Sequence, residues 1–212
     1  MKARRPKNTK VASGRGATNL RNKWRNWIDA IAIDVANQLE SFDTYKSLLS
    51  IVKANPRIHE PSYLHNWIFS NYASASTVAL RRFDDVDKQS QSLGRMLYEM
   101  IEYPGVITRR SHKSRYASNR YRADLTFDSF VGKGHKCLGP ARIRSDLHKL
   151  EKSCKRLRRF VNKRVAHVGA TGSILVNPTY CDLEKALSEI DSIVFYYQLL
   201  LIGSAPTTQK PT

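Results

Sequence analysis

The sequence lacks any apolar run approaching the roughly 20 residues that a membrane-spanning helix requires, so we expect no transmembrane segment. Its first ten residues, MKARRPKNTK, are not followed by a hydrophobic segment, which argues against a secretory signal. Cysteine is also scarce, and the three that occur, Cys137, Cys154 and Cys181, are odd in number and widely spaced. We therefore interpret them as reduced thiols and expect a cytoplasmic protein.

Strand patterns are missing as well, because no sustained alternation of apolar and polar residues is bounded by turns. Apolar residues instead recur at spacings of three and four, which is typical of amphipathic helices. This spacing predicts helices over about 20–54, 61–83, 93–101, 141–168 and 183–201. We therefore predict an all-α protein built as an antiparallel bundle of four to five long helices.

Local signals predict where the helices begin and end. Asn55-Pro56 should end the first helix, Ser92 should cap the third, and Thr179 with Asp182 should cap the last. We expect one helical domain over residues 19–203, a disordered basic arm over 1–18 and a disordered tail over 204–212. Three tryptophans at helical spacing are predicted to lie in the core: Trp24, Trp27 and Trp67.

Acidic residues are scarce in two segments of this chain, whose net charge is +18. Residues 1–25 carry nine Lys and Arg and no acid, and residues 109–164 carry eighteen against four, a net charge of +14. Residues 26–108 and 165–212 are slightly acidic, at −3 and −2. Such a concentration of cations repels itself unless an anion neutralises it, which favours nucleic acid over an acidic protein or an anionic membrane surface as the partner.

The helix predicted over 141–168 carries a stripe of cations. At roughly 100° per residue, six residues fall on one face: Lys149, Lys152, Arg156, Arg159, Lys163 and His167. The opposite face is apolar and runs through Ile143, Leu147, Leu150, Cys154, Leu157, Val161, Val165 and Val168. A solvated face is one interpretation of the stripe. We favour an anion-binding face, because glutamates at i,i+4 that would pair with these cations are nearly missing.

His167 is open to two interpretations. Its cation would suit the C-terminal end of a helix, which is a structural role. Alternatively it is a general acid or base, since metal-independent RNA cleavage needs a group that moves the 2′-hydroxyl proton and a cation that stabilises the charged transition state. Neighbouring cations lower a histidine pKa and so favour the neutral base.

The run Asn162-Lys163-Arg164-Val165-Ala166-His167 resembles the signature of HEPN domains, specifically their abortive-infection (AbiU-type) branch. Further points of similarity are Trp67, the pairs Arg81-Arg82 and Asp84-Asp85, Ser92-Leu93, and an Asn-Pro-Thr turn before the last helix. The resemblance covers about residues 20–203. It implies a helical bundle that commonly dimerises and that in many members is an RNase of toxin–antitoxin, abortive-infection or CRISPR systems.

In that family the catalytic motif is an Arg, four to six intervening residues and then His. With His167 fixed, those positions hold Asn162, Val161 and Phe160, and Arg159 lies one position farther away. The resemblance therefore implies His167 as acid or base and Asn162 as the assisting polar residue. Arg159 or Arg164 would take the place of the motif arginine at the phosphate.

The segment RRSHKSRYASNRYR, residues 109–122, interleaves cations with tyrosines. Cations can follow phosphates while aromatic rings stack on unpaired bases, so this is either an RNA-binding loop or a disordered basic loop. We expect a long exposed loop over much of 109–140, with helix near 125–131. Together with the stripe, the nucleic-acid-binding candidates are Lys149, Lys152, Arg156, Lys163, Arg109, Arg110, Arg115, Arg120 and Arg122.

Three acids in four residues, Asp84, Asp85 and Asp87, suggest either a metal site or a helix junction at which they pair with Arg81 and Arg82. We favour the junction, because no histidine or further carboxylate has ligand spacing nearby, and we expect neither metal nor cofactor.

The sequence thus predicts a HEPN-like RNA-binding protein of a phage-defence or toxin–antitoxin system, a homodimer and a candidate metal-independent endoribonuclease. The alternative is a non-catalytic dimerisation module that docks an antitoxin or another acidic partner.

Overall fold

The computed structural model describes residues 10, 12–59, 63–116, 120–162 and 178–203. Their helices are α1 (Gly14–Ala54), α2 (Pro56–His59), α3 (Tyr63–Phe83), α4 (Leu93–Glu102), the 3-10 turn η1 (Pro104–Val106), α5 (Arg109–Lys113), α6 (Arg120–Val131), α7 (Pro140–Ser153), α8 (Lys155–Phe160) and α9 (Tyr180–Leu201). The described residues contain an isolated bridge between Thr108 and Cys137 but no strand. The all-α prediction is therefore confirmed.

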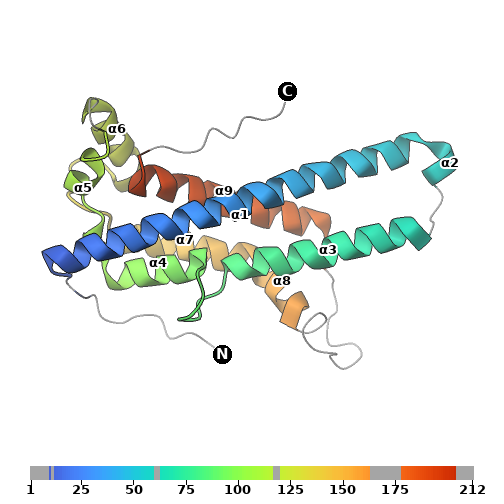
Figure 1. Cartoon of the computed structure of the whole chain (residues 1–212), viewed down its shortest axis with the longest axis horizontal. Coiled ribbons are helices and arrows are strands. Elements are labelled where there is room, and N and C mark those ends of the chain that lie inside the picture. Colours follow the sequence, from blue (N-terminus) through green and yellow to red (C-terminus); the bar gives the residue numbers. More distant parts are fainter. Residues whose placement is uncertain (1–9, 11, 60–62, 117–119, 163–177, 204–212) are drawn as a thin grey trace.

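The helices pack around α1, which runs along nearly the whole length of the molecule (Figure 1). α9 and α3 run antiparallel to α1, and α4 and α7 pack together beside them. The core is aliphatic and aromatic, and Trp24 and Ile28 of α1 and Met96 and Leu97 of α4 are fully buried in it. None of the helices in the described ranges is long and apolar enough to cross a bilayer.

One carboxylate is buried in this core with its partners. Glu99 of α4 accepts a hydrogen bond from the Trp24 indole Nε1 at 2.8 Å and one from Lys23 Nζ at 2.8 Å. Arg95, one turn earlier on α4, lies 3.8 Å from the same carboxylate. The indole nitrogen and the acid are both buried, so each satisfies the other and fixes α1 against α4.

The predicted helix ends are confirmed where the structure describes them. α1 stops at Ala54, and Asn55 is extended. The Ser92 side chain accepts a bond from the Arg95 N–H at 3.0 Å. Thr179 and Asp182 form a capping box, in which the Asp182 carboxylate accepts the Thr179 N–H at 2.8 Å. The start of α1 differs, since it begins at Gly14 and takes in the last residues of the segment predicted as an arm.

The helix predicted over 141–168 is interrupted at Cys154, which separates α7 from α8. Residues 163–168 lie outside the described part of the chain. The Ser153 hydroxyl donates to the Leu150 carbonyl at 2.9 Å, a side-chain bond that competes with the regular ladder. The apolar stripe nevertheless stays inside across the junction, because Leu150, Cys154 and Leu157 are all fully buried.

The expectation of a long exposed loop over much of 109–140 was wrong. Thr108 and Ser111 form a capping box that begins α5, and α6 extends from Arg120 to Val131. Ala123 and Phe127 of α6 are fully buried, but the acids of this helix pair with Arg109 and Lys113, so its apolar pattern was too weak to predict its full length.

The core prediction held for Trp24 but not for Trp67. Trp24 is fully buried and Trp27 is partly buried against the core, whereas the Trp67 side chain is 67% exposed. The reason is visible in Figure 1, where the α1–α2–α3 end projects beyond the other helices and leaves the start of α3 uncovered.

A candidate anion-binding surface

The cationic stripe of α7 and α8 is exposed but partly neutralised. Lys149 lies 3.9 Å from Glu189, and Arg156 forms an ion pair with Asp182 at 3.0 Å. Lys152 and Arg159 are exposed. The acids that pair with the stripe lie on α9 rather than at i,i+4 on the same helix, so the absence of local glutamates did not mean that the stripe was unpaired.

The residues that resemble the HEPN signature lie partly within the described part of the chain. Asn162 is exposed just beyond the end of α8. Lys163, Arg164 and His167 lie outside the described residues. The catalytic arrangement of Asn162, Arg159, Arg164 and His167 therefore stays a prediction.

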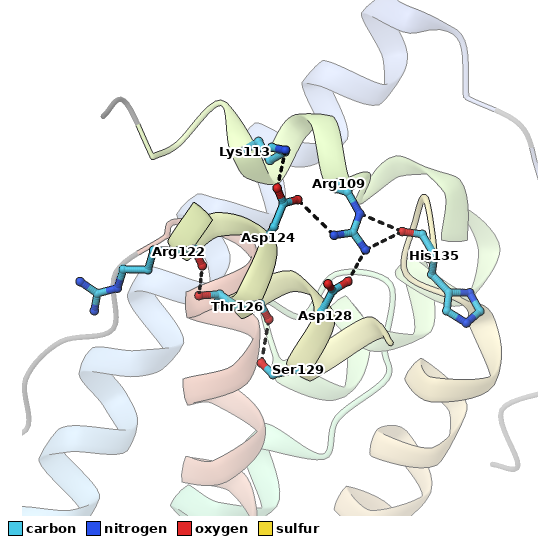
Figure 2. A network of polar contacts seen from close by, with 8 residues as sticks. All are labelled: Arg109, Lys113, Arg122, Asp124, Thr126, Asp128, Ser129 and His135. Carbon is cyan, nitrogen blue, oxygen red and sulfur yellow. Dashed lines mark hydrogen bonds and ion pairs between the residues drawn. The ribbon is translucent and has the colours of Figure 1, made fainter. Parts of the chain in front are cut away.

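Arg109 is held in a polar network that joins α5 to α6 (Figure 2). Its guanidinium contacts Asp124 at 3.1 Å, forms an ion pair with Asp128, and donates to the His135 carbonyl at 3.0 and 3.1 Å. Lys113 also binds Asp124, and these two cations hold the pKa of Asp124 below its usual value. The contacts give Arg109 a structural role, which differs from the predicted role in binding nucleic acid.

Two hollows adjoin this network and share Thr108, Arg110 and Ser114. The larger has a volume of about 880 Å³ and the smaller about 410 Å³. Together they form what we call the basic concavity, lined by Thr18, Arg21, Asn22, Arg25, Thr108, Arg109, Arg110, Ser111, Lys113, Ser114, Arg115, Tyr116 and Lys136. Seven of these residues are Lys or Arg and none of this lining is Asp or Glu.

Neutral groups, not carboxylates, orient the arginines of the smaller hollow. Arg21 donates to the Val106 carbonyl at 3.2 Å and to the Thr18 hydroxyl at 2.8 Å. Arg25 donates to the Leu201 carbonyl at 3.1 Å and to the Asn22 side chain at 3.2 Å. Arg115 is half-buried, and burial followed by the nearby Arg21 charge lowers its pKa. The positive charges are thus positioned without being neutralised.

Four of the predicted nucleic-acid-binding residues other than Arg109 belong to this end of the molecule. Arg110 and Arg115 line the basic concavity. Arg122 is exposed on α6 and points away from the network of Arg109 (Figure 2). Arg120 begins α6, and its side chain lies outside the description.

The predicted basic surface over 109–167 is divided in space. α5 and α6 lie at one end of the bundle, and α8 lies toward the other (Figure 1). Sequence reasoning missed Arg21, Arg25 and Lys136 as partners of α5. The signal for the first two was present, because residues 1–25 contain no acid.

The junction interpretation predicted that the acids after α3 pair with Arg81 and Arg82, which holds for Asp85 with Arg81 but not for Asp84, whose partner is Arg158. Asp84 is 4% exposed and forms an ion pair with Arg158 of α8 at 2.8 Å, while Asp85 lies 3.7 Å from Arg81. Burial raises the pKa of Asp84 to about 7, and Arg158 opposes this shift. No group of three metal-ligating side chains is found among the residues that the structure describes.

The basic concavity has the chemistry of an anion-binding surface. Its cations, hydroxyls and half-buried tyrosine can bind an anion, and they include no described acid that could serve as a general base. Comparisons with protein-family models, with curated proteins and with solved structures find no match to this chain.

Proposed function

We propose that this protein binds RNA through the basic concavity. The observation that carries the proposal is a hollow surface with seven cationic side chains and no described acid in its lining. Only Arg109 and Lys113 of these cations form ion pairs among the described residues. The other five keep their charge available to a ligand: Arg21, Arg25, Arg110, Arg115 and Lys136.

Aromatic side chains beside the cations favour single-stranded RNA. Tyr116 lines the larger hollow, and Tyr121 at the start of α6 is 75% exposed. Unpaired bases stack on such rings while cations follow the phosphates, and a duplex offers no unstacked base to them. An acidic protein would use the cations but would not require the tyrosine rings.

The binding experiment is a salt titration with a fluorescent 20-nucleotide single-stranded RNA. We expect log Kd to rise with log salt by roughly 0.7 per phosphate contact. The variant Arg110→Gln/Lys136→Gln should bind more weakly and lower this slope by about 1.4, because two phosphate contacts are lost.

The matched control is Lys53→Gln/Arg57→Gln, which removes the same charge from exposed positions at the other end of α1 and in α2. It should retain both the affinity and the slope of the wild type. Equal losses in the two double variants would show that net charge, and not the basic concavity, determines binding.

We further propose that the protein is a HEPN-like member of a phage-defence or toxin–antitoxin system and cleaves the RNA that it binds. The support is the motif resemblance, together with the exposure of Arg159 and Asn162 at the end of α8. Labelled total RNA incubated with EDTA should be cut by the wild type and not by His167→Ala. Full cleavage by His167→Ala would refute the assigned role.

The second candidate is a non-catalytic dimerisation module, and one observation favours it. Apolar side chains are exposed at the projecting end of α2 and α3: Ile58 at 41%, Tyr63 at 97%, Leu64 at 62% and Trp67 at 67%. Contiguous exposed apolar residues mark interaction surfaces. Light scattering should then report a dimer that Leu64→Ser/Trp67→Ser converts to a monomer. A stable complex with an acidic protein, without RNA affinity, would favour this candidate over the first.

A further inference from the structure

The smaller hollow of the basic concavity differs from the larger one in how its cations are held. In the larger hollow, Arg109 and Lys113 are bound to Asp124. In the smaller hollow, Arg21 and Arg25 are bound to main-chain carbonyls and to neutral side chains. The two hollows therefore offer an anion different amounts of unneutralised charge.

Four guanidinium groups line this hollow of about 410 Å³: Arg21, Arg25, Arg110 and Arg115. Each guanidinium carries five N–H donors. The bonds among the described residues use two donors of Arg21, two of Arg25 and one of Arg115. Most of the donors thus remain for a ligand, while the bonds that are formed fix the direction of Arg21, Arg25 and Arg115.

The anchoring carbonyls come from distant parts of the chain. Arg21 is anchored by Val106, next to α5, and Arg25 by Leu201 at the C-terminal end of α9. A helix C-terminus carries partial negative charge, so it stabilises a cation without cancelling it. The rest of the lining is neutral and polar: Thr18, Asn22, Thr108, Ser111 and Ser114.

Several cations converging on one small hollow suit a compact anion with more than one charge. A phosphodiester of an RNA backbone carries one negative charge, whereas a terminal phosphate monoester carries about −1.5 to −2 near pH 7 and has three strong acceptor oxygens. Arginine forks also match phosphate geometry better than lysine does.

We propose that the smaller hollow between α1 and α5 is a site for a terminal phosphate monoester, and that the larger hollow receives the adjoining nucleotides. The inference rests on the proposed RNA binding and adds the feature of RNA that is recognised. RNA with a phosphorylated end is selected over RNA with hydroxyl ends.

The test is competition of unlabelled RNAs against the labelled 20-mer at fixed salt, using the full chain. The competitors are 12-mers of one sequence with a 5′-phosphate, with a 3′-phosphate or with hydroxyl ends, and a 14-mer with hydroxyl ends. The 14-mer carries about the same total charge as a 12-mer with one terminal phosphate. We expect one phosphorylated 12-mer to compete about tenfold better than both hydroxyl RNAs. Whether it is the 5′- or the 3′-phosphorylated 12-mer shows which end of the RNA the site binds.

Two variants and one control separate this site from general charge effects. Arg21→Gln/Arg115→Gln should abolish the preference for the phosphorylated end. Because Arg21 also donates to the Val106 carbonyl, Thr18→Asp offers a second approach: it places a carboxylate in the hollow from an exposed position in the second turn of α1. Asn19→Asp adds the same charge at the neighbouring exposed position outside the lining, and it should keep the preference.

Equal competition by phosphorylated 12-mers and the 14-mer would overturn the phosphate site while leaving RNA binding intact. Failure of every RNA to bind would instead refute the proposed function. In that case adenosine monophosphate, at matched ionic strength, should still raise the melting temperature of the wild type and not that of Thr18→Asp. Absence of this stabilisation would overturn the site as well.

Discussion

Replacing Asp84 with asparagine should remove a large part of the pH dependence of this protein's stability. The Asp84 carboxyl lies between the end of α3 and α8, and Arg158 is its ion-pair partner at 2.8 Å. Burial raises the pKa of Asp84 from 3.8 to about 7, with Arg158 and Arg81 lowering it and Glu151 and Asp85 raising it. The folded protein therefore binds this proton more tightly than the unfolded chain does.

Proton linkage gives the sign and the size of this pH dependence. A carboxyl with a raised pKa contributes stability when it is protonated, and this contribution is lost as the pH rises from about 4 through about 7. A difference of about 3 pH units corresponds to about 4 kcal/mol, of which about 2 to 3 kcal/mol falls between pH 5 and pH 8. Asparagine keeps the shape of the side chain and does not titrate.

Urea unfolding followed by far-UV circular dichroism at pH 5, 6, 7 and 8 measures this difference. The free energy of unfolding of Asp84→Asn, relative to wild type, should rise by about 2 to 3 kcal/mol from pH 5 to pH 8. The comparison cancels the titration of other groups, such as the buried His112, whose pKa is lowered by burial. Parallel profiles for the two proteins would refute the reasoning.

Three further predictions concern stability and binding. Glu99→Ala should lower the free energy of unfolding by about 3 kcal/mol, because the Trp24 indole loses its buried acceptor. Glu99→Gln keeps an acceptor and should cost less. Equal losses of stability in urea unfolding would contradict this prediction. Gly203→Ala should cost about 1 kcal/mol in the same assay, since Gly203 has a φ of +90° and an added Cβ would lie 3.1 Å from the Arg115 Cβ. Arg109→Gln should lower the free energy of unfolding by about 1 kcal/mol and speed amide hydrogen exchange in α6. It should weaken RNA binding less than Arg110→Gln does. The reverse order of affinities would show that Arg109 contacts RNA.

Local chemistry made the long helices and their ends predictable from sequence. The Ser92 and Thr179 caps depend on residues within three positions of each other, and the stripe from Ile143 to Leu157 repeats with the helical period. Such signals need no knowledge of which helices become neighbours.

The remaining features depend on contacts between distant segments. α6 is stabilised where Asp124 and Asp128 meet Arg109, and no apolar period announces that pairing. Trp67 has the spacing of a core residue, but its helix extends beyond the helices that could cover it. The partner of Arg156 is 26 residues away on α9, so the local sequence showed the cation without its carboxylate.

The anchors of the smaller hollow give it a further property, since Arg21 and Arg25 belong to the first helix while their carbonyl partners lie 85 and 176 residues later. The hollow thus exists only when the beginning, middle and end of the domain have come together. An anion bound in the hollow would contact all three segments, and by mass action it would stabilise the folded state over states in which they are apart. Shortening α9 by one turn should consequently weaken anion binding even though no arginine is removed.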